Sequence, residues 1–405
     1  MIFGGQCILV NKISDTIDVA IVMKQNRWGF MVNMNRKLKV LMFTIANTKG
    51  GHSQYCLNNY KFINPEKIQM DFITFSKHIS YESEIEERGG RIIYLKNHPS
   101  KNREEFIIEF SKVLEQKYDV IHLHTSYWAD TIVEELAHKF KIPRIIIHAH
   151  STGIGNTAPK FAKDVLDRHY KIRDSIDVSL ATDFWACSKE AGDWLYGDRI
   201  PKERIRIINN AVDTDRFRFN RLRRNSMRLE NNLEDCQVVG FVGRLEQPKN
   251  VEFIMGLANV LITDDNNVDF LIVGEGSKRG YIEEKIDEYN LNGRVRLVGF
   301  QSNIEDWLQA MDVFILPSYF EGFPLVLIEA QVSGLKCLAS RNMSEKVVLT
   351  DNIELLDLNL DLWKNKILEY SRGYLRISQG ELVKNKGYDI KEQAHKLEEE
   401  YLIDV

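Results

Sequence analysis

The sequence has few cysteines, and those that it has are scattered. Its 405 residues include five, which is an odd number, and no two of them have the Cys-x-x-Cys spacing. The five are Cys7, Cys56, Cys187, Cys236 and Cys337. This distribution argues against a disulfide framework and against a zinc finger. We therefore expect a protein of the reducing cytoplasm, folded without covalent cross-links.

Long apolar runs and a strong net charge are also missing. No apolar run approaches the roughly 18 to 20 residues needed to cross a bilayer, and the N-terminus lacks a charged segment followed by an apolar one. We predict neither a transmembrane helix nor a signal peptide. The formal net charge of −4 gives no general attraction to polyanions. A nucleic-acid partner is therefore not expected.

The length and the hydrophobic pattern together predict two α/β domains. A chain of 405 residues exceeds the size at which one core keeps growing. Short apolar runs alternate with amphipathic stretches of helical length, which is typical of βαβ units. The runs form two series, at 40–45, 70–75, 91–95, 120–124 and 144–148, and then at 238–242, 268–273, 295–298, 313–316 and 336–339. We predict two doubly wound parallel-sheet domains.

The domain boundaries follow from where these series begin and end. Residues 1–33 precede the first convincing strand and are assigned to a leader or extension outside the pattern. We expect one domain at 34–210, a second at 211–389, and a C-terminal helix at 390–405 that packs back on the first domain. An arginine-rich stretch follows the linker and suits either a solvated face or a contact with anionic lipid. It comprises Arg216, Arg218, Arg221, Arg223, Arg224 and Arg228.

Two carboxylates surround a loop in the second series. The sequence Pro317-Ser318-Tyr319-Phe320-Glu321-Gly322-Phe323-Pro324 follows a predicted strand, and an apolar run that predicts a helix begins at Leu325. Glu329 lies eight positions after Glu321. Ligands of doubly wound sheets bind at the carboxyl ends of the strands, where helix N-termini attract anions. The loop therefore suits a phosphorylated, polyhydroxylated ligand.

Two cations and two glycines follow other strand ends. Arg244 and Lys249 are five positions apart, just after the first strand of the second domain, and could clamp a diphosphate. A solvated pair beside a turn is the alternative, but the place at a strand's carboxyl end favours binding. Gly50 and Gly51 follow the first strand and suit either a phosphate-approach loop or an ordinary turn.

Histidines alternate along two predicted strands. His122 and His124 are two positions apart, as are His148 and His150, so each pair points to one side of its strand. Parallel strands are covered on both faces and no carboxylate stands at ligand spacing, so core histidines are favoured over a metal site. His150, at the end of its strand, is the best placed of the four to meet a ligand. We predict no metal site.

Taken together, these residues resemble the retaining glycosyltransferases of family 4, which have the GT-B fold of two Rossmann-like domains facing a central cleft. The resemblance covers nearly everything after Met34. Its most specific part is the Glu321/Glu329 pair, joined by Gly243-Arg244 and Lys249. Val273-Gly274-Glu275-Gly276 and Asn209-Asn210-Ala211-Val212-Asp213 complete the set. Bacterial enzymes that build capsular or exopolysaccharide repeat units are the most similar, through residues 330–338.

The resemblance implies a role for each matching position. Arg244 and Lys249 would hold the donor diphosphate, Glu329 the ribose hydroxyls, and Glu321 the transferred sugar near the reacting centre. His150 would lie beside the donor sugar, which makes Glu321, His150, Arg244 and Lys249 the expected catalytic set. The remaining positions expected to bind the nucleotide sugar are Gly50, Gly51, Gly243, Gly299, Gly322, Phe323 and Pro324.

The resemblance also implies an activity. The expected reaction moves a sugar, with retention, from a nucleotide-diphosphate sugar, most often a UDP-sugar, to a lipid-linked or polysaccharide acceptor. It needs no metal and no further cofactor, and it would take place in the cytoplasm with peripheral contact at the inner membrane face. The alternatives are a UDP-sugar 2-epimerase on the same fold and a non-catalytic partner subunit. One departure is that residues 340–347 replace the Gly-Gly-x-x-Glu loop of many relatives.

Overall fold

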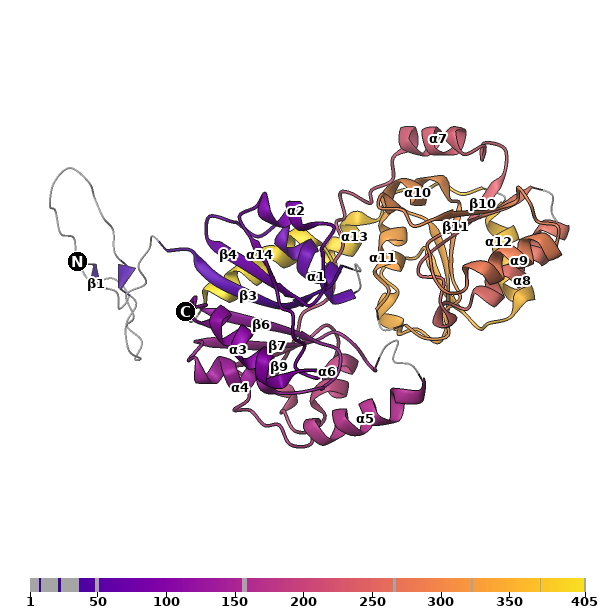
Figure 1. Ribbon diagram of the computed structural model, residues 1–405. Helices are drawn as coiled ribbons and strands as arrows, with labels where there is room; N and C mark the ends of the chain where they lie inside the picture. Colours follow the sequence, from indigo (N-terminus) through magenta and orange to yellow (C-terminus); the bar gives the residue numbers. More distant parts are fainter. Residues whose placement is uncertain are drawn as a thin grey trace. The chain divides into compact units, whose positions relative to one another are not determined.

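The computed structural model describes residues 36–47, 51–154, 159–264, 267–321, 323–371 and 373–403, together with two short N-terminal strands. The chain divides into two units, Met1–Arg36 and Lys37–Val405. In the first unit, β1 (Cys7–Ile8) pairs antiparallel with β2 (Ile21–Val22), and the rest of the leader predicted at 1–33 lies outside the described residues. The second unit contains two parallel sheets (Figure 1).

The N-terminal sheet has seven parallel strands with helices on both faces (Figure 1). Its order is β5 (Arg91–Tyr94), β4 (Ile68–Thr74), β3 (Leu38–Ile45), β6 (Val120–Thr125), β7 (Arg144–Ala149), β8 (Asp183–Ala186) and β9 (Ile205–Ile207). Successive side chains of a strand point to opposite faces. Leu41 accordingly joins one apolar cluster, whereas Val40 and Met42 join another. The central strands are therefore buried on both faces.

The C-terminal sheet has six parallel strands within one continuous apolar core. Its order is β12 (Val295–Gly299), β11 (Val268–Val273), β10 (Gln237–Val242), β13 (Val313–Leu316), β14 (Lys336–Ser340) and β15 (Ile353–Leu356). In both sheets the chain order reverses beside a central strand, which is the doubly wound arrangement. The predicted fold class, two Rossmann-like parallel-sheet domains, is confirmed.

The helices connect successive strands, as parallel pairing requires. Those that belong with the first sheet are α1 (Gly51–Tyr60), α2 (Glu82–Glu86), α3 (Arg103–Leu114), α4 (Ile132–Lys139), α5 (Pro159–Arg173), α6 (Lys189–Tyr196) and the short η1 (Lys202–Arg204). Those that belong with the second are α7 (Arg221–Glu230), η2 (Gln247–Lys249), α8 (Val251–Asp264), α9 (Arg279–Glu288), α10 (Ile304–Ala310), α11 (Leu325–Val332), η3 (Glu345–Val347), α12 (Leu360–Ser371) and α13 (Gly380–Asn385). The last helix is α14 (Ile390–Leu402).

Helix α14 returns to the first sheet after the chain has left the second. Asp389 caps its N-terminus by accepting from the backbone N–H groups of Lys391 and Glu392. At the other end Tyr401 is fully buried in the cluster that contains Val40, and its hydroxyl lies 2.5 Å from Nδ1 of His122. The C-terminal segment thus completes the core of the N-terminal domain.

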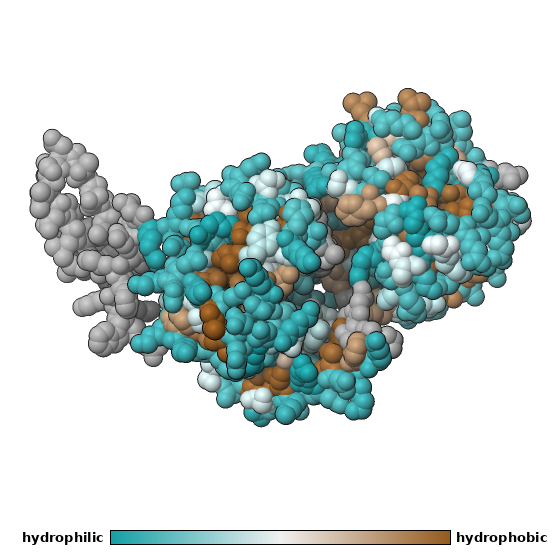
Figure 2. Space-filling model, in the orientation of Figure 1, coloured by the Kyte–Doolittle hydropathy of each residue, from teal (hydrophilic) through white to brown (hydrophobic). Residues whose placement is uncertain are grey.

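The arginine-rich stretch runs into α7, and four of its six arginines pair with acidic residues of the same domain. Arg216 pairs with Glu305 at 2.7 Å, Arg223 pairs with Asp306, and Arg224 and Arg228 both reach Asp312. These four arginines therefore do not form the open basic surface that contact with anionic lipid needs. Hydrophobic residues instead mark the outer side of α7 (Figure 2), where Leu222 is 81% and Leu229 62% exposed.

In the second unit, three short strands, β8, β9 and β15, were not predicted from the sequence. Strand β9 contains only three residues, none of them buried, and β15 is the outermost strand of its sheet, with two of its four residues buried. Edge strands lose the continuous apolar run that identifies a central parallel strand. Among the described residues, no helix is both long enough and apolar enough to cross a membrane.

Substituting Gly240 in β10 tests how tightly the C-terminal core is packed. A Cβ at this position would overlap the buried Met311 side chain, so Gly240→Ala should cost about 1–3 kcal/mol of stability and lower the midpoint of thermal unfolding. Gly256→Ala in α8 is the matched control, because its Cβ would meet only Leu360 at 3.6 Å. The control should be neutral or stabilising by up to about 1 kcal/mol. Equal midpoints for the two variants would contradict this packing.

Candidate functional site

The loops that follow β10 and β13 are hydrogen-bonded to each other. These strands are neighbours, so their carboxyl ends lie side by side. The backbone N–H of Tyr319 donates to the carbonyl of Pro248 at 2.9 Å, and the Asn250 side chain donates to the carbonyl of Pro317 at 3.0 Å. Asn250 adopts the left-handed conformation, with φ 56°, which asparagine tolerates better than most residues. The two loops therefore form one rigid edge.

This edge brings together Lys249 and Glu321, two of the predicted site residues. They form an ion pair in which both side chains are about 15% exposed, and Ser318 Oγ donates to the same Glu321 oxygen at 2.8 Å. Arg244, by contrast, is exposed, and no ion pair to it is found in the described part of the chain. One predicted cation is thus held in place by a carboxylate, whereas the other is free to turn toward a ligand.

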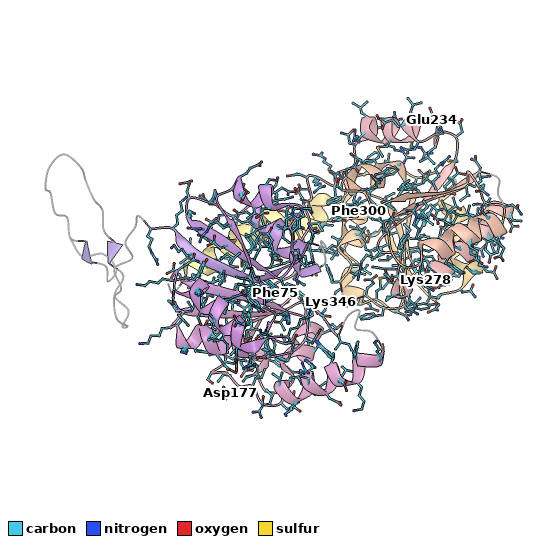
Figure 3. The ribbon with its side chains drawn as sticks, in the orientation of Figure 1. Phe75, Asp177, Glu234, Lys278, Phe300 and Lys346 are labelled. Carbon is cyan, nitrogen blue, oxygen red and sulfur yellow. The ribbon has the colours of Figure 1, made fainter. Side chains whose placement is uncertain are left out.

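Glycines stand at the carboxyl ends of β10, β11 and β12, as Gly243, Gly274 and Gly299. Gly274 has φ +146°, and a Cβ there would overlap the carbonyl oxygen of Gly243. The N–H of Gly274 donates to the carbonyl of Gly299 at 2.8 Å, and Gly299 has φ +74°. Phe300, labelled in Figure 3, follows and is 71% exposed. Gly274 therefore lets the loops after β10 and β11 pack backbone to backbone, which a residue with a side chain would prevent.

Glu329 lies on α11, one helix turn after its buried N-cap Pro324. Burial raises the pKa of its carboxyl group to about 7, an effect that nearby Arg216 opposes and Glu305 reinforces. Within the described ranges, its carboxylate has no hydrogen-bond or ion-pair partner. A carboxylate that changes charge near neutral pH and has no partner among the described residues suits binding to hydroxyl groups.

Phe323, predicted to bind the nucleotide sugar, packs against the segment that leads out of the domain. Its ring stacks on that of Tyr388, with centroids 5.3 Å apart and planes 10° apart. The carbonyl of Tyr388 accepts from the N–H of Val212 at 3.0 Å, so the stack lies where the chain enters and leaves the C-terminal domain. Gly50 and Gly322 lie outside the described residues, and α1 begins at Gly51, as the sequence predicts for a helix after a glycine turn.

The four histidines from the alternating pairs gather on one face of the N-terminal sheet. His122 Nε2 lies 3.2 Å from His148 Nδ1, and His124 Nδ1 lies 2.8 Å from His150 Nε2. Burial lowers the pKa of His122 to about 3 and lowers the pKa values of the other three well below normal. All four imidazoles are therefore neutral near pH 7.

The segment that replaces the Gly-Gly-x-x-Glu loop connects the two domains. It ends β14 at Ser340 and enters η3, where Ser344 caps the N–H of Lys346 at 3.4 Å. Nζ of Lys346, labelled in Figure 3, lies 2.9 and 3.1 Å from the carboxylate oxygens of Glu190 in α6. The lysine therefore binds a side chain of the N-terminal domain.

Two family profiles match adjacent parts of the chain. The profile described as Glycosyltransferase Family 4 matches residues 49–216, and that described as Glycosyl transferases group 1 matches residues 223–358. Together they cover most of the chain and divide it where the two sheets divide. The chain belongs to the GT-B glycosyltransferases.

Relatives and solved structures agree with the assignment of the chain to the glycosyltransferases. EpsF from Bacillus subtilis, named as a glycosyltransferase, is 28% identical over 78% of this chain and 82% of its own length. The UDP-Gal:alpha-D-GlcNAc-diphosphoundecaprenol alpha-1,3-galactosyltransferase of Escherichia coli is 27% identical over 75% of this chain and 80% of its own. The Anabaena protein HepE, solved in complex with UDP, has the same fold, with a TM-score of 0.72, 18% identity, and coverage of 90% and 99% of the two chains.

Several residues of the glycosyltransferase site were not predicted from the sequence. Asn250 and Ser318 hold the loops around the Lys249/Glu321 pair, and Tyr388 supports Phe323. Asn250 could have been suspected, since asparagine after a short Pro-Lys turn is a common left-handed residue. Nothing in the sequence near Tyr388 indicates its partner 65 positions away.

Asn250 offers a test of how the two loops are held together. Asn250→Gly keeps access to the left-handed conformation but loses the hydrogen bond to Pro317, whereas Asn250→Ala loses both. We expect a loss of about 1–3 kcal/mol for the unsatisfied buried carbonyl and about 1–2 kcal/mol more for alanine in this conformation. Thermal unfolding midpoints should therefore fall in the order wild type, glycine, alanine. An alanine variant as stable as the glycine variant would contradict the strained backbone.

Proposed function

We propose that this glycosyltransferase transfers a sugar from a UDP-sugar, with retention of configuration, to a lipid-linked or polysaccharide acceptor in capsule or exopolysaccharide synthesis. The observation that carries the proposal is the Lys249/Glu321 pair at the carboxyl ends of the neighbouring strands β10 and β13. The names of relatives support the substrate classes, since the Escherichia coli enzyme takes UDP-Gal and a diphosphoundecaprenol acceptor. The UDP complex of HepE supports the nucleotide.

The cations of the site suit the departure of the nucleotide. When the bond between the sugar and the diphosphate breaks, negative charge collects on the leaving phosphate. Lys249 is already held at the site edge, and exposed Arg244 can turn to form a planar, bidentate contact. A positive group that is already fixed, as Lys249 is, stabilises a developing anion without reorganisation. We propose that transfer therefore needs no divalent cation and no further cofactor.

The carboxylates have different roles in this proposal. Glu321 is neutralised by Lys249 and Ser318, so it is suited to bind and orient the sugar hydroxyls and poorly suited to attack the anomeric carbon. The acceptor oxygen attacks from the side the diphosphate leaves, and its proton passes to the leaving phosphate oxygen. Glu329 accepts from the ribose hydroxyls, Gly243 and Gly299 border the nucleotide, and His150 lies beside the donor sugar.

The proposed acceptor implies contact with a membrane surface. A diphospho-lipid acceptor of the kind named for the Escherichia coli relative is confined to a bilayer. We propose that the enzyme meets it by peripheral contact at the inner face.

Two substitutions in the ion pair separate binding from catalysis. Lys249→Met should weaken UDP binding at least tenfold, because a charge-assisted contact to the diphosphate is lost. Glu321→Gln should leave UDP binding equal or tighter, since it frees Lys249, while kcat falls by about 10²–10³. Titration calorimetry with UDP and sugar release from a UDP-sugar panel without added metal provide the measurements.

Lys366→Met is the matched control, because Lys366 pairs with Glu354 near the far end of the same domain; it should change neither quantity. An unchanged kcat in Glu321→Gln would contradict the role of Glu321. UDP binding without transfer from any donor would favour the non-catalytic subunit, and interconversion of free UDP-sugars would favour the epimerase.

The raised pKa of Glu329 predicts pH-dependent donor binding. Only the ionised carboxylate accepts hydrogen bonds from both ribose hydroxyls, so affinity should rise as the pH rises through about 7 and then level off. Between pH 6 and pH 8 the dissociation constant of a UDP-sugar should fall by about tenfold. Glu329→Gln should bind weakly with no such pH dependence. An intact UDP-sugar is used because its diphosphate lacks the terminal phosphate group that titrates in this range. The same slope in the variant would assign the effect to another group.

A further inference from the structure

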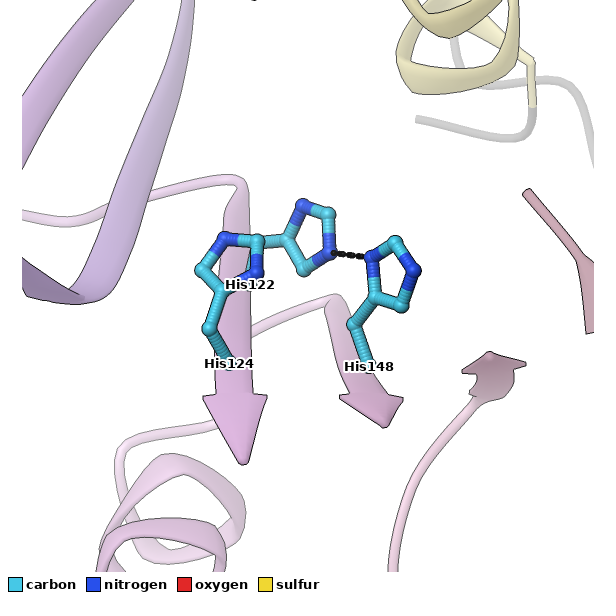
Figure 4. Close-up of side chains that lie close together, drawn as sticks. All are labelled: His122, His124 and His148. Carbon is cyan, nitrogen blue, oxygen red and sulfur yellow. Dashed lines mark hydrogen bonds between the residues drawn. The ribbon is translucent and has the colours of Figure 1, made fainter. Parts of the chain in front are cut away.

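Three buried histidines of the N-terminal sheet lie close together. His122 and His124 lie on β6, and His148 lies on the neighbouring strand β7, directly beside His124 in the register. One ligand nitrogen from each can be chosen so that all three lie within 4.8 Å of one another (Figure 4). All three side chains are at most 8% exposed. They come from one face of the sheet, which α1 and α14 cover.

The tautomers that the surrounding hydrogen bonds allow can leave a lone pair on each ring. A neutral imidazole has one N–H donor and one acceptor nitrogen. The Nδ1–H of His122 can donate to the Tyr401 hydroxyl, 2.5 Å away, which leaves its Nε2 as an acceptor. This Nε2 lies 3.2 Å from His148 Nδ1, close to the roughly 3.4 Å that separates two nitrogens bound to one tetrahedral zinc ion.

The tautomer of His124, the third histidine of the cluster, can be assigned in the same way from its hydrogen bond. Its Nδ1 lies 2.8 Å from His150 Nε2, so the contact with His150 can fix its tautomer. Its Nε2 is buried and has no partner among the described residues. Metal-binding histidines usually have their second ring nitrogen held in this way by an outer group. Tyr401 and His150 therefore stand where outer partners of His122 and His124 would stand.

We propose that His122, His124 and His148 bind a divalent transition-metal ion, with Zn²⁺ as the best fit, in the core of the N-terminal domain. An all-imidazole set suits zinc, copper, nickel or cobalt and does not suit magnesium or calcium, which need oxygen ligands. The burial that keeps these rings neutral also leaves their lone pairs ready to bind metal near pH 7.

The fourth position belongs to Tyr55 of α1. Its hydroxyl oxygen is buried without a partner in the described structure, and its ring lies 5.0 Å from that of His148. A phenol oxygen there would add a fourth ligand to the three imidazoles. The ion would then join β6, β7 and α1, with α14 attached through Tyr401.

The decisive experiment measures metal retention by the full-length chain without a polyhistidine tag. The protein is incubated with Zn²⁺, desalted and analysed for metal by mass spectrometry. We expect about one equivalent, a thermal midpoint raised by about 5 °C over the metal-free chain, and tetrahedral d–d absorption when Co²⁺ replaces Zn²⁺. His148→Gln and His124→Gln should retain less than about a tenth of an equivalent.

The variants are chosen to separate the site from incidental binding. His78→Gln is the matched control, because His78 is exposed, and it should retain the full equivalent. Tyr401→Phe keeps the ring but removes the outer hydroxyl, and should lower zinc affinity by about 10–100-fold. Failure of the wild-type chain to retain metal, or equal retention by His148→Gln, would overturn the proposal.

The wild-type result stands even where a variant fails to fold, since retention and the Co²⁺ spectrum are measured on the native chain. The proposal does not depend on the proposed sugar transfer. Metal content is measured without turnover, so the failure of one proposal can be distinguished from the failure of the other.

Discussion

The candidate site depends on one partly buried ion pair, that between Lys249 and Glu321. Neither charge is stable alone at this depth, because an isolated buried charge has a large desolvation cost. Each therefore holds the other in place until a ligand supplies a replacement. When a ligand arrives, its diphosphate can bind Lys249 and its sugar hydroxyls can bind Glu321. The contacts within the ion pair are then replaced by contacts with the ligand. The rest of the site keeps the two side chains at this distance.

Lys249 and Glu321 are held together by the backbone of the loops that follow the neighbouring strands β10 and β13. Asn250 turns the chain in a left-handed conformation and holds the carbonyl of Pro317, while the loop after β13 bonds back to Pro248. Beyond the loop, Phe323 lies on Tyr388, next to the short bridge between Val212 and Asp389 where both chain crossings meet. Direct contacts therefore link the loop after β13 to the segments that connect the domains, so a movement of this loop can be transmitted to them.

Much of this fold follows from the sequence, because the central strands are mainly apolar runs buried on both faces. The predicted strands 268–273 and 313–316 coincide with β11 and β13. What the sequence could not give was pairing across long separations. Lys249 and Glu321 are 72 positions apart and meet only because β10 lies beside β13. The contact between the two histidine pairs could likewise be predicted only if the order of β6 and β7 were known. Alternation shows that the histidines of one strand share a face, but it does not show that both strands direct them to the same face of the sheet.

The contact between Lys346 and Glu190 has a consequence for motion. Both side chains are about half exposed, so the pair contributes at most about 1 kcal/mol, little more than thermal energy. Such a contact breaks and forms again many times during one catalytic cycle, and dissolved salt weakens it further. The ion pair favours an arrangement in which the two domains of the enzyme are in contact. It is weak enough to break when a substrate enters or a product leaves.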